Sequence, residues 1–369
     1  MNPPVAAHPA LSTRACELFG VRYPVVQTGM GWVSGARLTA ATAEAGGLGI
    51  LASATMTLEE LGAAITRVEG RTSNPFGVNL LPSQPDAAER ISLIIERGVR
   101  VASFAAAPRA DQVARLGDAG VATVVTVGAP RHAEKVLSMG VDAVIAQGGE
   151  GGGHTGSIPT SLLVPGVVEA TRGSDLVVLA AGGMHDGSSL AGALGWGADG
   201  IAMGTRFLLT AESQVPEHVK DVYLRSGLNS TVVTTAIDGA PQRVIRTEVI
   251  DGLESARGPM RFLAAARNAF AFARQSGTSP MDLLRTARNM HDDSELTWAQ
   301  VALAANAPMM TRASVVDGDL GVGILPTGQV VGSIEDLPTV AGLIEGIVVG
   351  ASEQLEGLCG SGPVDTDEN

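Results

Sequence analysis

Short apolar segments alternate with helix-like segments eight times between residues 23 and 205, and this alternation leaves few folds open to the chain. The apolar segments do not alternate polar with apolar residues, so we interpret them as strands buried on both faces. Strands of this kind occur in parallel sheets that helices cover. Eight strand–helix units in succession favour a closed (β/α)8 barrel, the TIM barrel, over an open sheet. The predicted strands are residues 23–30, 49–53, 76–80, 99–104, 122–127, 143–147, 176–181 and 200–203.

The segment from 213 to 332 falls outside the alternation, and we predict a second, smaller and mainly helical domain there that covers the substrate at the barrel mouth. A β pair, residues 231–237 and 243–249, is expected around the turn signal Asp238-Gly239. The barrel is assigned to 1–212 and 333–360, and the polar tail 361–369 is expected to be disordered. The predicted helices are residues 37–44, 58–68, 87–97, 109–119, 130–139, 162–170 and 188–194 in the barrel, 259–274, 280–290 and 296–311 in the second domain, and a last barrel helix within 332–358.

Charge and composition exclude several classes of protein. The net charge is −13 and aromatic residues make up 3%, whereas a nucleic-acid surface needs a basic stripe and stacking rings. No charge-free apolar run is long enough to cross a bilayer, and residues 1–12 lack the pattern of a signal peptide. Cys16 and Cys359 offer neither a CxxC motif nor a metal-ligand spacing, so we expect no metal site and a cytoplasmic location.

Glycines follow the last two predicted strands, at Gly182-Gly183 and at Gly204-Thr205. Backbone amides at such strand-to-helix turns bind anions, and the corresponding loops of TIM barrels hold phosphate groups. A phosphate-bearing cofactor is therefore expected here, although tight packing of strand on helix would also explain the glycines. The partial fingerprint Gly29-x-Gly31 lacks the third glycine of a dinucleotide-binding loop, so we reject a Rossmann fold.

The sixth predicted strand ends at Gln147 and opens into a glycine-rich loop, residues 148–156, that contains His154. Glycines allow the backbone to approach a ligand closely, and histidine is the side chain whose ordinary pKa lies nearest neutral pH. The pattern favours His154 as a catalytic base. An ordinary surface or packing histidine is the alternative.

Several segments together resemble the nitronate monooxygenase (2-nitropropane dioxygenase-like) family of FMN-dependent barrels, which is itself similar to flavin-dependent enoyl reductases. The matching segments occur in the expected order over roughly residues 20–212, with a further match near 328–351. At residues 150–154 the family more often has Glu-Ala-Gly-Gly-His, whereas this chain has Gly151 in place of the alanine. The segments are Pro24-Val-Val-Gln-Thr-Gly-Met-Gly, Ala45-Gly-Gly-Leu-Gly-Ile, Phe76-Gly-Val-Asn, Gln147-Gly-Gly-Glu-Gly-Gly-Gly-His-Thr-Gly, Ala181-Gly-Gly and Met203-Gly-Thr-Arg-Phe.

The resemblance implies a role for each matching residue. His154 corresponds to the family's catalytic histidine, and Gly152 is expected to approach the flavin closely. The remaining members of the implied FMN site are Thr28, Gly29 and Met30 along the flavin ring, Asn79 and Gln147 as hydrogen-bonding partners, and Gly182, Gly183, Met203, Gly204 and Thr205 around the phosphate.

A narrower resemblance, carried for example by the segment Gly49-Ile-Leu-Ala-Ser-Ala-Thr-Met-Thr-Leu and by Val232-Val-Thr-Thr, is to an actinobacterial subgroup of late steroid breakdown. It implies a flavin-dependent redox step on the CoA thioester of a steroid C/D-ring intermediate. His154 would move the proton beside the carbonyl, and flavin N5 would accept or donate the hydride. The alternatives are a nitronate monooxygenase that uses O2, a flavin-dependent enoyl reductase, and a barrel that binds FMN without turnover.

Three further expectations concern partners. The resemblance allows NADH as the electron partner and a homodimer as the assembly. Arginines between 243 and 288 could contact the phosphates of an acyl-CoA, because the guanidinium fork suits phosphate oxygens. Solvated helix faces with ion pairs would explain the same residues. The arginines are Arg243, Arg246, Arg257, Arg261, Arg267, Arg274, Arg285 and Arg288.

Overall fold

The computed structural model describes residues 7–255 and 298–360, and the chain divides into two compact units. Unit 1 contains Met1–Glu150, Ser157–Ser213 and Asp336–Asn369, and unit 2 contains Gly151–Gly156 and Gln214–Glu335. The predicted helices 259–274 and 280–290, the tail 361–369 and six of the eight arginines lie outside the described residues.

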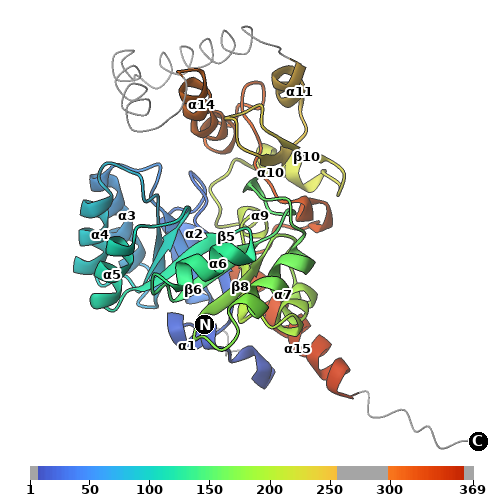
Figure 1. The fold of residues 1–369 in the computed structure, drawn as a ribbon. Helices are drawn as coiled ribbons and strands as arrows, with labels where there is room; N and C mark the ends of the chain where they lie inside the picture. The colour runs from blue at the N-terminus through green and yellow to red at the C-terminus, as the bar shows by residue number, and fades with distance from the viewer. Residues whose placement is uncertain (1–6, 256–297, 361–369) are drawn as a thin grey trace, which may run out of the picture. The chain divides into compact units, whose positions relative to one another are not determined.

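Unit 1 is a closed barrel of eight parallel strands, which confirms the predicted (β/α)8 fold. Its strands pair in the order β1-β2-β3-β4-β5-β6-β8-β9, and β9 returns to pair with β1. Strands β5, β6 and β8 of this barrel are labelled in Figure 1. In each of the eight barrel strands at most one residue is not buried, as expected of strands covered on both faces. The strands are β1 Val25–Gln27, β2 Leu48–Ala52, β3 Phe76–Leu80, β4 Val101–Phe104, β5 Ala122–Val127, β6 Ala143–Gln147, β8 Val177–Ala181 and β9 Gly200–Met203.

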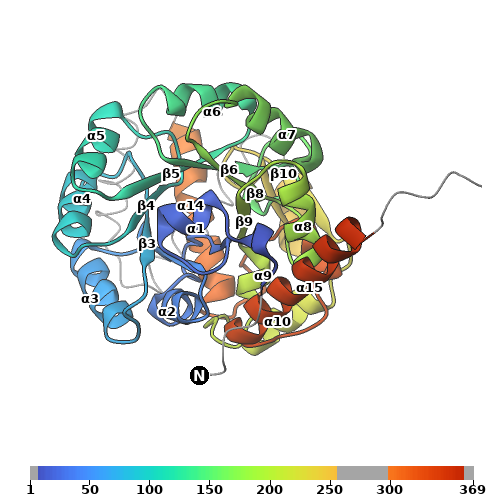
Figure 2. The same cartoon turned by 90° about the horizontal axis from the view of Figure 1, so that it is seen from below.

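Helices surround the barrel (Figure 2). The last one, α15, packs against α8 and α2 and completes the ring. Contact with α8 is close, because a Cβ added at Gly187 would lie 2.3 Å from the Ala351 nitrogen. These helices are α2 Ala36–Glu44, α3 Leu58–Glu69, α4 Ala87–Glu96, α5 Ala110–Asp118, α6 Pro130–Leu137, α7 Thr160–Ala170, α8 Gly187–Gly195, α9 Thr205–Leu208 and α15 Val340–Gly360.

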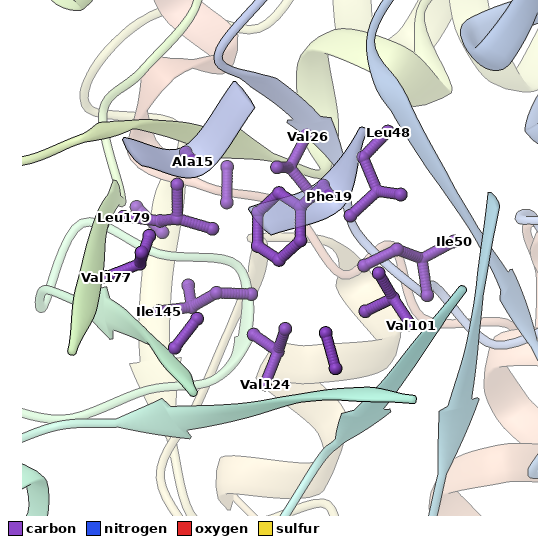
Figure 3. Packing of buried hydrophobic residues seen from close by; sticks show 14 residues of the cluster. Ala15, Phe19, Val26, Leu48, Ile50, Val101, Val124, Ile145, Val177 and Leu179 are labelled. Atoms are coloured by element: carbon purple, nitrogen blue, oxygen red, sulfur yellow. The ribbon is translucent and has the colours of Figure 1, made fainter. Parts of the chain in front are cut away.

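Phe19 closes one end of the barrel. It lies on α1, Arg14–Phe19, which follows the short 3-10 helix η1, Pro9–Leu11. Its ring is fully buried among inward side chains, and Figure 3 shows it at the centre of the cluster. The cluster includes the first residues of several strands, among them Leu48, Val101 and Val177. The plug is therefore at the N-terminal end of the strands, so the opposite, C-terminal end is the one that can hold a ligand.

Unit 2 contains a three-stranded sheet in the order β10-β11-β7. The predicted pair around Asp238-Gly239 is confirmed as the antiparallel hairpin of β10 and β11, with shorter strands than expected. Strand β7 was not predicted. In unit 2, Val244 of β11 packs with buried apolar residues of α11 and α14 in a separate core. The elements are α10 Glu217–Leu224, β7 Gly153–His154, β10 Thr231–Thr234, β11 Gln242–Ile245, α11 Glu248–Ser255, α14 Trp298–Val315 and the 3-10 helix η2 Gln329–Ser333.

Within the two described ranges, no helix combines the length and the apolar character that crossing a bilayer requires.

Candidate active site

Ten of the residues assigned to the flavin lie in unit 1, at or just after the C-terminal ends of barrel strands. Parallel strands end at the same rim, so the fold brings these positions together. The segment Thr28–Met30 follows β1, and its neighbour β9 ends at Met203. Asn79 lies near the end of β3 and Gln147 is the last residue of β6. Gly182 and Gly183 follow β8, while Gly204 and Thr205 follow β9.

The segment after β1 is tied to both sides of this rim. The amide and the hydroxyl of Thr28 both donate to the Met203 carbonyl oxygen, at 3.1 and 3.2 Å. On the other side, a Cβ added at Gly29 would lie 2.4 Å from the Cβ of Asn79. Any side chain at Gly29 would push the segment away from β3. The predicted neighbours Thr28, Gly29, Asn79 and Met203 thus form one continuous surface.

Ser34, which was not among the predicted site residues, holds this segment in shape. Its hydroxyl donates to the Thr28 carbonyl at 2.8 Å and accepts from the Met30 amide at 2.9 Å. The buried side-chain amide of Gln27 donates to the same hydroxyl at 2.8 Å. Trp32, inside the segment, has φ of 66°, which a bulky residue adopts only under strain. These contacts fix the backbone from Thr28 to Ser34.

The turn after β8 is open and consists of backbone. Gly182 and Gly183 have φ of 94° and 81°, a region that favours glycine. A Cβ added at Gly183 would meet nothing within 4 Å, so no protein atom occupies the space directly beside this residue. The Gly182 carbonyl is held by the Thr160 hydroxyl at 3.0 Å. Asp186 caps the following helix α8 through the Ser189 amide at 2.9 Å.

His154 belongs to unit 2, where it forms part of strand β7 beside β11. Its Nε2 lies 2.8 Å from Oδ2 of Asp238, and the Gln242 side-chain amide also donates to that oxygen. The imidazole is 66% exposed, whereas the Asp238 side chain is 8% exposed. The arrangement therefore presents an accessible imidazole on a buried carboxylate.

Burial alone would raise the pKa of the Asp238 carboxyl. Hydrogen bonds from His154, the Ala240 amide and Gln242 outweigh burial and hold this pKa below its usual value. The Ala240 amide donates to Oδ1 at 3.0 Å, so both carboxylate oxygens accept hydrogen bonds. Asp238 is consequently an anion at neutral pH. Asp238 and Gln242 were not predicted as site residues; the hairpin turn was the only signal for that region.

Gly152 also lies in unit 2, against the backbone of Thr327 and Gly328. A Cβ added at Gly152 would lie 2.4 Å from the Thr327 carbonyl carbon and 2.5 Å from the Gly328 nitrogen. This contact requires a glycine whatever ligand the loop meets. The close approach to the flavin that the resemblance implies for Gly152 stays a prediction.

Two of the eight arginines considered for CoA binding are described, and both have protein partners. Nη1 of Arg243 donates to the Thr231 hydroxyl at 2.8 Å. Arg246 forms an ion pair with Asp251 at 2.8 Å, and both side chains are more than half exposed. Exposed pairs of this kind contribute little to stability.

A model of the nitronate monooxygenase family matches residues 12–350. Two curated relatives are each named (3aS,4S,5R,7aS)-5-hydroxy-7a-methyl-1-oxo-octahydro-1H-indene-4-carboxyl-CoA dehydrogenase. The one from Mycobacterium tuberculosis is 54% identical over 94% of this chain and 98% of its own length. The one from Rhodococcus jostii is 51% identical, again over 94% of this chain and 98% of its own length.

A solved structure of FabK from Thermotoga maritima superposes on this chain with a TM-score of 0.75 at 32% identity, covering 94% of this chain and 98% of FabK. The family match extends over both units of the fold, and the relatives at 54% and 51% identity span nearly the whole chain. The chain therefore belongs to the nitronate monooxygenase family and is a flavin-dependent oxidoreductase.

Proposed function

We propose that the protein is an FMN-dependent oxidoreductase acting on the CoA thioester of a steroid C/D-ring degradation intermediate, in the cytoplasm. The observation that carries the substrate class is the 54% and 51% identity, over 94% of the chain, to two dehydrogenases named for an indene carboxyl-CoA. The observation that carries the chemistry is His154, an exposed imidazole held by the buried carboxylate of Asp238.

The residues at the barrel rim fit FMN in two respects. A phosphate needs backbone donors without side chains in the way, and the Gly182-Gly183 turn is open at Gly183. A flat ring needs a fixed surface, and the segment from Thr28 to Met30 is held by Ser34 on one side and Met203 on the other. We assign Thr28, Gly29, Met30, Asn79, Gln147, Gly152, Met203, Gly204 and Thr205 to FMN binding as well.

The role of the protein side chains follows from the acidity of the substrate. A thioester carbonyl acidifies the adjacent C–H bond, and removing that proton requires a base within reach. His154 supplies this base when a double bond is introduced, and it returns the proton when one is reduced. Base catalysis of this kind contributes about 10²–10⁴-fold in rate. Bound flavin supplies the two-electron chemistry.

Nitronate oxidation is the second candidate function. It is favoured by the family model, which is that of nitronate monooxygenases and matches residues 12–350. A nitro group acidifies its neighbouring C–H as a thioester does, so the same histidine could serve either substrate. The two functions differ in which compound reduces the flavin.

Anaerobic stopped-flow spectroscopy separates the candidates. The purified protein is mixed with a steroid-ring acyl-CoA, with NADH or with propionate-3-nitronate, and bleaching of the flavin is followed. We expect rapid bleaching by the acyl-CoA or NADH and none by the nitronate. Bleaching by the nitronate alone would overturn the thioester assignment in favour of the second candidate.

The variant His154→Ala tests the base. We expect the flavin content to stay unchanged. Flavin reduction by the effective acyl-CoA, meaning the one that bleaches the wild-type flavin, should slow by about 10²-fold or more. His218→Gln is the matched control, because His218 also lies in unit 2 and its Nε2 contacts a backbone carbonyl, that of Gly318, at 2.9 Å. Equal rates in wild type and His154→Ala would remove His154 from the mechanism.

A further inference from the structure

We infer that Asp238 is the positioning residue of the acid–base site: it binds the Nε2–H of His154, so that Nδ1 is the nitrogen that exchanges a proton with the substrate. Gln242 holds the Asp238 carboxylate in place. The inference rests on the proposed role of His154 and names the residues, and the nitrogen, that this role requires.

The donors around Asp238 decide which nitrogen of His154 carries the proton. An amide N–H can only donate, and the Ala240 amide points at Oδ1 from 3.0 Å. The hydrogen bonds to Asp238 outweigh its burial and leave it an anion that accepts on both oxygens. His154 Nε2 lies 2.8 Å from Oδ2. Two lone pairs at that separation repel each other, whereas Nε2–H donating to the carboxylate gives a charge-assisted hydrogen bond. The neutral imidazole is therefore the Nε2–H tautomer, with its basic lone pair on Nδ1.

The orientation of the Gln242 side chain follows by the same argument. Its Nε2 donates to Oδ2 of Asp238 and lies 3.3 Å from Nε2 of His154. The reversed amide would place its oxygen against the carboxylate, which is unfavourable. Gln242 therefore donates to Asp238 and does not compete with His154 for a proton.

The sheet of unit 2 fixes the distances in this arrangement. Gln242 is paired with His154 across β11 and β7, and with Thr234 across β11 and β10. Directly opposed residues share one face of a sheet, so the three side chains form a row. The adjacent strands are also joined by the Thr155 amide, which donates to the Pro241 carbonyl at 3.1 Å.

The backbone on both sides of Asp238 holds this residue as well. The residue before it, Ile237, is fully buried in the apolar core of unit 2 together with Ala236. The residue after it, Gly239, has φ of 92°, which turns the chain back toward β11. The carboxylate is thus buried, while the imidazole that it holds is exposed. This division of roles is that of a positioning carboxylate and a base.

Nuclear magnetic resonance of the full-length flavoprotein labelled with ¹⁵N-histidine tests the inference without substrate. The two tautomers give distinct ¹⁵N shifts and couplings for Nδ1 and Nε2, and His154→Gln assigns the signal. We expect Nε2–H in the wild type. We expect Asp238→Asn to shift the population toward Nδ1–H, because the asparagine amide can donate to Nε2. A wild-type signal from Nδ1–H would overturn the inference. This measurement uses the wild type, so it does not depend on whether Asp238→Asn folds.

Steady-state kinetics provides a second test of the inference. Asp238→Asn is expected to lower kcat for the effective acyl-CoA by about 10²-fold or more, as a wrong tautomer does elsewhere, with KM changed much less. Asp251→Asn is the matched control, since Asp251 is an exposed carboxylate of the same unit that pairs with Arg246. An unchanged kcat in Asp238→Asn would contradict the inference. If no acyl-CoA reduces the wild-type flavin, the proposed function is wrong. The tautomer of His154 measured by magnetic resonance still tests the role of Asp238 in that case.

Discussion

Trp32 is a strained residue in the segment that we assign to the flavin. Its φ of 66° is the only positive value at a residue other than glycine in the described ranges. Holding a side-chain-bearing residue there costs about 1–3 kcal/mol, and such strain tends to occur at functional sites. The contacts of Ser34 with Thr28 and Met30 are what hold the backbone in this shape.

A pair of substitutions measures this strain. Trp32→Gly and Trp32→Ala both remove the indole, but glycine adopts a positive φ freely and alanine does not. We expect Trp32→Gly to be more stable than Trp32→Ala by about 1 kcal/mol in free energy of unfolding. Urea denaturation of the two variants provides the value. A Trp32→Ala protein as stable as Trp32→Gly would show that this backbone is not strained.

For single residues, the sequence supports His154 as a candidate catalytic base but cannot identify the residues that bind it. The glycine-rich loop after an apolar run singles out this histidine. Asp238 and Gln242 lie 84 and 88 residues away along the chain, and no local pattern connects them to it. Their proximity arises from the pairing of β7 with β11, a long-range contact that a single sequence does not encode visibly. The catalytic role of His154 itself stays a prediction.

The secondary-structure elements of the barrel could be predicted because their signals are local. Buried parallel strands are continuous apolar runs, and each predicted run overlaps one strand of the barrel. The exceptions have physical causes. Strand β1 stops at Gln27 instead of continuing to Met30, because the hydrogen bonds of Ser34 curl the chain away from the sheet. Strand β7 contains only Gly153 and His154, too few residues to show any periodicity.

The loop that carries β7 depends on a close backbone contact, and this gives a prediction about Gly152. Gly152→Ala would place a Cβ 2.4 Å from the Thr327 carbonyl carbon, so the loop or the Thr327–Gly328 backbone must move. We expect the shift to displace His154, two residues on, and to lower kcat at least about 10-fold, since small misplacements of catalytic groups are costly. Stopped-flow reduction by the effective acyl-CoA measures it.

Gly128→Ala is the control for that substitution. Gly128 is also a loop glycine, but a Cβ there would meet nothing within 4 Å and its φ is not positive. Its kcat and stability are expected to match those of the wild type. If Gly152→Ala also behaves as the wild type, the contact with Thr327 is not what positions β7.

At the scale of the whole molecule, the predicted division of the chain and the observed one differ in a short segment. The barrel was assigned to 1–212 without interruption, whereas Gly151–Gly156 forms part of unit 2. Six residues between β6 and α7 carry no compositional shift that could mark them as part of another unit. The role of unit 2 in covering the substrate stays a proposal, and so does its mainly helical character over 256–297, outside the described residues.

Acidification acts on the whole molecule and on Asp238 in separable ways. The chain carries a net charge of −13 at pH 7 and becomes neutral near pH 4.9. This change in overall charge affects the wild type and Asp238→Asn almost equally, so the difference between them isolates one carboxyl group. The pKa of Asp238 is lower in the folded protein than its value of 3.8 without the fold, so the unfolded state binds the proton more readily. Stability from this group is therefore present above that value and is lost as pH falls through the folded pKa.

Asparagine resembles a protonated aspartate, so Asp238→Asn tests how the Asp238 anion changes the free energy of unfolding. Near pH 7 the wild type should have a larger free energy of unfolding than Asp238→Asn, because the variant lacks the anion that His154, Gln242 and the Ala240 amide bind. The difference should shrink below about pH 4, where the wild-type carboxyl becomes protonated as well. Urea unfolding of both proteins at a series of pH values gives the two curves. A difference that does not change between pH 6 and pH 3 would mean that the anion does not stabilise the fold, and the hydrogen bonds to Asp238 would then have to be those of a neutral acid.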